Sequence, residues 1–185
     1  MKQRIVILLS SLMLVLVMTQ CKKGDTGPQG PAGPQGPQGP VGTPNVIYSE
    51  WFTATPWIKD TVFGIWGFKY NKPVPAITQP VLDSGVVLVY GKLLGYNPAV
   101  WPTTQVAQLP ILITYLQSGK TQTDTWSGLA TPGNLRIRFV NNTNEYNVIA
   151  TQHQFRYIVL PGGKKDARVA QLTYAQVCKM YRIPE

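Results

Sequence analysis

The residue whose type and position predict the most definite chemistry is Cys21. It follows a positively charged start, with Lys2 and Arg4, and an apolar run over residues 5–18 that only two serines interrupt. This run is short for a bilayer span, which takes about 20 residues, and is typical of a secretory signal peptide. A cysteine placed directly after it is the pattern of bacterial lipoprotein processing. We therefore expect residues 1–20 to be removed and Cys21 to carry acyl chains that anchor the protein in a membrane.

The motif before the cysteine departs from the usual lipobox. Gln20 stands where a small residue is common, and Met18 stands where leucine is common. The alternative is a short membrane anchor that is not cleaved. Both interpretations place the rest of the chain outside the cytoplasm.

The other side chains that could act in catalysis or metal binding are scattered along the sequence. The globular part has a single histidine, His153, and one further cysteine, Cys178, and neither stands at metal-ligand or nucleophile–base spacing. Two facing carboxylates would suit glycoside hydrolysis; the candidates are Glu50, Asp60, Asp83, Asp124, Glu145 and Asp166. The sequence predicts no metal, no cofactor and no catalysis, and an envelope hydrolase is the less favoured alternative.

Aromatic and basic residues are the candidates for ligand binding. Trp57 and Trp101 each stand beside a proline in loop-like sequence, where an exposed indole can stack on a sugar ring. Arg136, Arg138 and Arg156 are expected on the outer face of the sheet, as a basic patch. The plainer alternative is that the tryptophans belong to the core and the arginines to a solvated face.

A strict glycine repeat follows the predicted anchor. Glycine recurs at every third position from Gly24 to Gly42, and proline fills most of the positions after it. In collagen only glycine fits at the axis where three polyproline-II chains meet. The repeat predicts an extended stalk over residues 21–44, either as a homotrimeric triple helix or as a single-chain polyproline-II spacer.

Composition places the domain boundary at the end of this repeat. Residues 1–44 contain no aromatic residue, so we expect one globular domain over residues 45–185. Four of the 17 basic residues and one of the 8 acidic residues precede it, which leaves 13 against 7, or +6. A basic balance suits nucleic acid, anionic lipid or an acidic polysaccharide, and in an exported chain nucleic acid is the least expected of these. The candidate partner is an extracellular glycan or protein, and the plainer alternative is a basic, soluble surface.

The sequence of the globular part predicts a mostly β fold. Short segments of alternating or apolar character, separated by turn residues, predict an antiparallel β-sandwich or barrel. We expect strands over residues 46–55, 61–70, 86–90, 111–116, 122–130, 135–140 and 154–159, and a helical turn over 77–83. In residues 135–140 the pattern turns Leu135, Ile137 and Phe139 inward.

One helix is expected at the C-terminus. Thr173 and Gln176 form a capping-box pattern, and Tyr174, Val177, Cys178 and Tyr181 share one face. Cys178 on this face is expected to be buried.

The order of these parts resembles a group of bacterial collagen-like lipoproteins, in which a lipobox cysteine, a short Gly-X-Y run and a C-terminal domain follow one another. The stretch over residues 77–90 and the closing helix look similar to that group as well. The resemblance implies attachment to the cell envelope, at the outer membrane or cell surface. It implies no activity and supplies no site residues.

Overall fold

The computed structural model describes residues 46–162 and 169–185. The predicted signal peptide, Cys21 and the Gly-X-Y stalk lie outside the described residues. Among the residues that the structure describes, no helix has the length and apolar composition that crossing a membrane requires.

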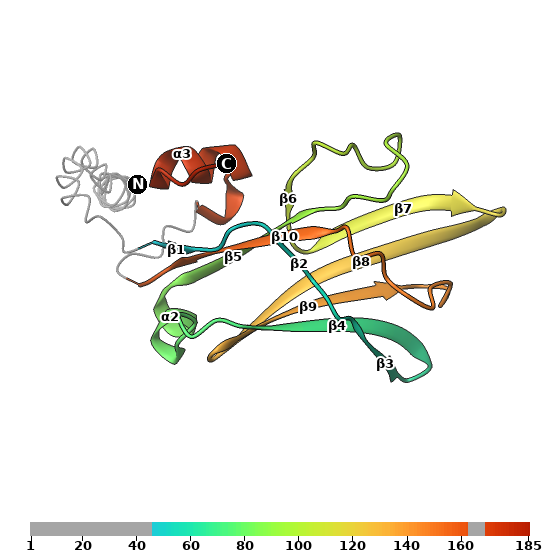
Figure 1. The fold of residues 1–185 in the computed structure, drawn as a ribbon, viewed down its shortest axis with the longest axis horizontal. Helices are drawn as coiled ribbons and strands as arrows, with labels where there is room; N and C mark the ends of the chain where they lie inside the picture. Colours follow the sequence, from blue (N-terminus) through green and yellow to red (C-terminus); the bar gives the residue numbers. More distant parts are fainter. Residues whose placement is uncertain (1–45, 163–168) are drawn as a thin grey trace, which may run out of the picture. The chain divides into compact units, whose positions relative to one another are not determined.

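The described chain is mostly β, with two antiparallel sheets and a short C-terminal helix, as predicted (Figure 1). The first sheet has the order β1-β10-β5-β6, with β2 also paired to β10, and the second has the order β3-β4-β9-β8-β7. The described strands do not close into a barrel, so that alternative is wrong.

The first sheet is built around its last strand. β10 (Gln154–Leu160) pairs with β5 (Val86–Lys92) on one side and with β1 (Ile47–Tyr48) and β2 (Phe52–Thr53) on the other, and β6 (Ala107–Gln108) pairs with β5. The strand expected over residues 46–55 is thus two short strands that meet one partner in succession.

The second sheet consists of β3 (Ile58–Val62), β4 (Ile65–Pro73), β7 (Ile111–Gln117), β8 (Lys120–Thr131) and β9 (Asn134–Asn141). The single strand predicted over residues 61–70 is wrong, because Phe63 and Gly64 have positive φ angles of 50° and 80° and reverse the chain between β3 and β4. The strands predicted over residues 111–116 and 122–130 are confirmed as β7 and β8, which form a hairpin that turns at Ser118 and Gly119.

The inward alternation in β9 is also confirmed. Leu135, Ile137 and Phe139 are at most 1% exposed. They share one core cluster with side chains from both sheets, including Phe68 of β4 and Phe155 of β10. The hydrophobic side of each sheet is therefore buried against residues of the other.

The C-terminal helix α3 (Tyr174–Tyr181) packs on the first sheet, whereas the short helix α2 (Gln79–Ser84) contacts one strand of each sheet, β5 and β8. The helix α2 is capped by Thr78 and confirms the predicted helical turn. The helix α3 follows the 3-10 turn η2 (Val169–Gln171) and has the predicted capping box between Thr173 and Gln176. Its buried residues Tyr174, Val177 and Cys178 pack in a second cluster with Leu88, Tyr90 and Ile158 of the first sheet.

Candidate functional site

Trp57 and Trp101, the two candidates for an exposed indole, both pack against the core, as the plainer alternative expects. Trp101 is only 7% exposed, and Trp57 is half-buried against the core. The Trp57 ring packs edge-on against Trp126 and Phe155, with centroid distances of 5.9 and 6.3 Å. Neighbouring prolines made these residues look like loop residues, but a large ring in a loop can still cover the core, and its burial stabilises the fold.

The predicted patch of three arginines does not form. Arg136 and Arg138 lie half-buried on the outer face of β9, where Arg136 Nε donates to Asn71 Oδ1 at 2.9 Å. Arg156 lies in the other sheet and is 1% exposed. The alternation along β10 predicted an exposed Arg156, but residues of α3 cover this side of the strand, and Arg156 is buried.

Arg156 instead ties three separate segments together. Its Nε donates to the Ser49 carbonyl at 2.8 Å, and its Nη1 donates to the Tyr174 hydroxyl and the Pro184 carbonyl, each at 2.5 Å. Its guanidinium carbon also lies 5.2 Å from the centroid of the Tyr48 ring. These contacts give Arg156 a structural role in joining the start of the domain to its C-terminus.

The acidic residues of the described part come from different segments of the chain. Asp60 lies 3.3 Å from Lys69 Nζ on the second sheet. In residues 46–162 and 169–185, no three His, Cys, Asp or Glu side chains form a group that could hold a metal ion. Asp124 alone combines complete burial with a dense set of polar contacts, and it leads to the candidate site.

Three tyrosine hydroxyls gather on one oxygen of Asp124. Tyr96, Tyr115 and Tyr146 lie 2.7, 3.2 and 3.1 Å from Asp124 Oδ2, and Asn141 Nδ2 donates to Oδ1 at 2.7 Å. The Asp124 side chain is 0% exposed. Hydrogen bonds from several donors offset the cost of burying a carboxylate.

The protons of this cluster can be assigned in part. The Trp126 indole Nε1 donates to the Tyr96 oxygen at 2.9 Å, so Tyr96 is free to donate its own proton to Asp124. Tyr115 and Tyr146 lie 2.5 Å apart, which requires that one of them donates to the other while the partner donates to Asp124. Burial raises the pKa values of Tyr96 and Tyr146 well above the usual range, and the adjacent Asp124 charge raises them further. Both residues therefore remain neutral phenols at physiological pH.

The same cluster holds the loop that leads from β9 to β10. Asn141 Oδ1 accepts from the backbone N–H groups of Thr143 and Glu145, at 2.9 and 3.1 Å, while its Nδ2 bonds Asp124. Thr143 Oγ1 donates to Gln122 Oε1 as well. The buried polar side chains of β8 and β9 thus fix the start of a loop that carries Tyr146.

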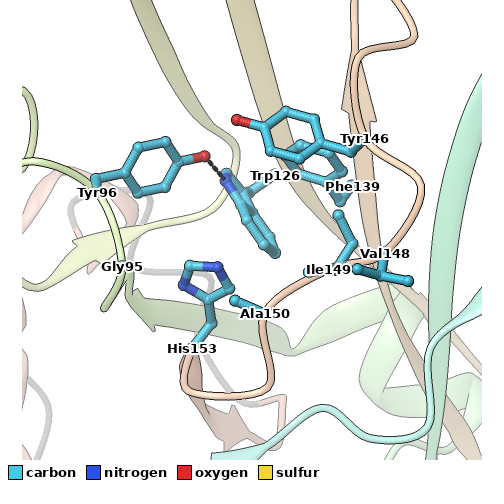
Figure 2. Close-up of a pocket in the computed structure, with 9 residues that line it drawn as sticks. All are labelled: Gly95, Tyr96, Trp126, Phe139, Tyr146, Val148, Ile149, Ala150 and His153. Carbon is cyan, nitrogen blue, oxygen red and sulfur yellow. Dashed lines mark hydrogen bonds between the residues drawn. The ribbon is translucent and has the colours of Figure 1, made fainter.

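A pocket of about 290 Å³ opens beside this cluster (Figure 2). The loop after β5 contributes Gly95 and Tyr96, the strands β8 and β9 contribute Trp126 and Phe139, and the segment before β10 contributes the rest: Tyr146, Val148, Ile149, Ala150 and His153. Gly95, Val148 and Ala150 are exposed and form the rim. Trp126, Phe139, Ile149 and His153 are buried.

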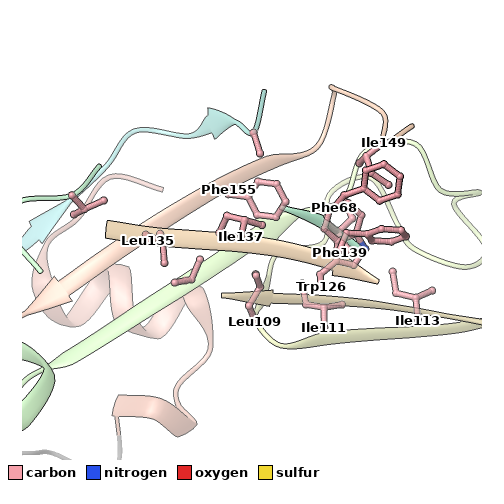
Figure 3. Packing of buried hydrophobic residues seen from close by; sticks show 14 of the residues in the cluster. Phe68, Leu109, Ile111, Ile113, Trp126, Leu135, Ile137, Phe139, Ile149 and Phe155 are labelled. Carbon is pink, nitrogen blue, oxygen red and sulfur yellow. The ribbon is translucent and has the colours of Figure 1, made fainter. Parts of the chain in front are cut away.

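The pocket wall is continuous with the hydrophobic core. Figure 3 shows Trp126, Phe139 and Ile149 gathered at one end of the cluster, with Leu135 toward the other. The Trp126 ring lies 4.6 Å from Phe139 and 5.8 Å from Phe155, measured between centroids. Since the core holds these rings in place, the wall of the pocket is preformed.

His153 contributes the imidazole of this wall. It is 6% exposed, its ring centroid lies 4.7 Å from that of Trp126, and its Nδ1 has no hydrogen-bond partner among the described residues. Burial lowers the pKa of His153 to about 4. The imidazole is therefore neutral at pH 7, and its unpaired Nδ1 is a buried atom.

The sequence did not bring these residues together. His153 does not stand at metal-ligand or nucleophile–base spacing, and Asp124 is one of several acids scattered along the chain. A local signal did exist in β8, where Gln122, Asp124 and Trp126 alternate with threonines. A charged residue on the side of a strand that also carries a tryptophan indicates a buried polar group with dedicated partners.

No protein-family model, curated protein or solved structure matches this chain.

Proposed function

We propose that this chain is a bacterial lipoprotein of the cell envelope, at the outer membrane or cell surface, whose globular domain binds a ligand without catalysis. In this proposal Cys21 carries the lipid anchor, and the Gly-X-Y segment over residues 21–44 holds the domain away from the membrane. The charged start, the apolar run and the position of the cysteine support the anchor. The strict glycine period supports the stalk.

We further propose that the domain is a β-sandwich. Its two antiparallel sheets place side chains in one shared core cluster, which is the arrangement that a sandwich requires. The helix α3 then lies outside the sandwich, on the first sheet, where it contributes to the second cluster.

The observation that carries the binding role is the preformed pocket beside Asp124. Its polar groups are poorly suited to proton transfer, because a general base works best with a pKa near the working pH. The pKa of His153 is about 4, and the Asp124 oxygen that faces the tyrosines is already committed to their hydroxyls. Aromatic walls with a few fixed polar groups are typical of a small-molecule binding site.

The proposed alternative of glycan binding through Trp57 and Trp101 has lost its main support, since both rings pack against the core. Arg136 and Arg138 remain on an outer sheet face and are available to an acidic partner. The pocket is the better candidate because it combines a concave shape with a wall of rings that the core holds in place.

The anchor is tested by replacing Cys21 with serine in the full-length protein and labelling cells with an alkyne analogue of palmitate. The wild type is expected in the membrane fraction with label, and Cys21→Ser is expected to lose the label. Cys178→Ala is the matched control, because Cys178 is buried in the domain and should leave labelling unchanged. Label on the Cys21→Ser protein would contradict the proposed anchor.

A further inference from the structure

The pocket has a buried negative charge behind its wall and no positive charge in it. Two of its lining residues, Tyr96 and Tyr146, bond the Asp124 carboxylate through their hydroxyls. No Lys or Arg side chain of the described ranges comes within 4.0 Å of that carboxylate. Buried charges in proteins are normally paired. The fold therefore leaves a buried carboxylate that has hydrogen bonds but lacks a counter-ion.

The walls favour a positive charge for a second reason. Four rings, of Tyr96, Trp126, Phe139 and Tyr146, line the pocket. Phe139 and Tyr146 meet edge to face at 5.2 Å and 87°, so their planes point in different directions around the space. The face of an aromatic ring carries partial negative charge and attracts ammonium groups. The aromatic rings and the Asp124 charge thus both favour a cationic ligand over an anionic one.

His153 does not oppose this attraction. Its neutral form adds no positive charge at pH 7, and its Nδ1 remains without a partner among the described residues. The rest of the pocket wall carries no charged side chain either, because none of the lining residues is Lys, Arg, Asp or Glu. An anionic ligand would meet the field of Asp124 with nothing to offset it.

The size of the pocket limits the ligand. A volume of about 290 Å³ is at the lower end of the range for small-molecule sites. The exposed rim residues Gly95, Val148 and Ala150 leave an opening to solvent. The space suits one compact headgroup with a short tail.

We propose that this pocket binds a small organic cation of the methylated-ammonium type. The alkyl groups contact the rings, and the positive charge lies toward the Tyr96 and Tyr146 hydroxyls with Asp124 behind them. This inference rests on the proposed role of the domain as a binding module and specifies its ligand.

The test is calorimetric titration of the full-length protein, solubilised in detergent, with choline and with 3,3-dimethyl-1-butanol. The second compound has the shape of choline with a carbon in place of the quaternary nitrogen, so it carries no charge. Choline is expected to bind at least about tenfold more tightly, which corresponds to one or two cation–π contacts. Equal affinity for the two compounds would overturn the proposal.

Two variants locate the binding. Ala150→Phe fills the exposed rim and is expected to abolish choline binding, whereas Ala175→Phe, on the exposed side of α3, is expected to leave it unchanged. Asp124→Asn should weaken choline binding about tenfold and leave the uncharged compound unaffected, provided that circular dichroism shows a folded domain. Choline binding that survives Ala150→Phe would overturn the site even if Asp124→Asn fails to fold.

The same samples separate this proposal from the anchor. Mass spectrometry of the purified protein reports whether Cys21 is acylated. An acylated protein that binds neither compound overturns the cation site and leaves the envelope anchor standing. A protein that binds choline but has no acyl group on Cys21 overturns the envelope anchor and leaves the cation site standing.

Discussion

The Tyr96 hydroxyl donates to Asp124 Oδ2 at 2.7 Å and accepts from the Trp126 indole at 2.9 Å. This one oxygen joins the loop after β5 to two neighbouring inward residues of β8. It satisfies the indole, supplies the carboxylate with a donor and fixes one wall of the pocket. The stability of the domain and the shape of its pocket therefore depend on the same group.

Tyr96→Phe is expected to lower the free energy of unfolding by about 2 kcal/mol, because it removes a hydrogen bond to a charged acceptor and leaves the Trp126 N–H without its partner. Urea unfolding of the full-length chain in a Cys21→Ser background measures the change. Tyr70→Phe is the control, since Tyr70 is half-buried in the same core and packs against Phe52 and Trp57. Equal losses in the two variants would show that the Tyr96 hydroxyl has no special role.

Stability should fall at mildly acidic pH because of His153. Its pKa is about 4 in the folded protein and about 6.5 in the unfolded chain. Above pH 6.5 both states are neutral, and His153 contributes no pH dependence. Between pH 6.5 and 4 the unfolded state takes up a proton that the folded state refuses, so unfolding becomes easier by up to about 1.4 kcal/mol per pH unit. Below pH 4 this contribution levels off.

His153→Gln removes the titrating group and should flatten the pH dependence of the unfolding free energy between pH 6.5 and 4. Urea unfolding at a series of pH values gives both curves. Parallel curves for the two proteins would mean that His153 is accessible to protons in the folded state.

Arg156 should be far more important for stability than the two outer arginines. Arg156→Met leaves the Tyr174 hydroxyl and two backbone carbonyls without their donor, and the expected loss is about 3 kcal/mol. Arg136→Met, on the outer face of β9, is the matched control and should cost less than about 1 kcal/mol. Thermal unfolding of the two variants compares them directly, and similar shifts would contradict the structural role of Arg156.

Local signals in the sequence predicted local structure well. The capping box at Thr173 and the alternation in β9 each depend on neighbours within a few residues, and both are confirmed. The error at Phe63 and Gly64 arose because a two-residue reversal with positive φ interrupts an otherwise continuous apolar pattern. The apolar pattern does not indicate a turn when a bulky residue such as Phe63 occupies the first turn position.

Long-range contacts explain the rest. The alternation in β10 correctly assigned Arg156 to the side of the strand that faces away from the shared core. The Arg156 side chain is nevertheless buried, because α3, which follows β10 in the sequence, covers that side. Tyr96, Trp126 and His153 come from separate segments, and only the packing of the two sheets brings them to one pocket. Spacing along the sequence carries no information about such a meeting point.

The glycine repeat leads to a prediction about assembly. We propose that the stalk from Gly24 to Gly42 supports a homotrimer on the membrane, where anchoring raises the effective concentration of chains to around millimolar. Native mass spectrometry of the detergent-solubilised protein should show trimers, and Gly33→Ala should reduce them because a side chain does not fit at the axis. A monomer in both samples, with no triple-helix circular dichroism signal, would leave the single-chain spacer as the account of the stalk.

The most direct test of the proposed envelope lipoprotein is the intact mass of the protein purified from membranes. A mature chain that begins at Cys21 and carries the added mass of its acyl groups is the predicted result. A chain that retains residues 1–20, or one that begins at Cys21 without added mass, would contradict it.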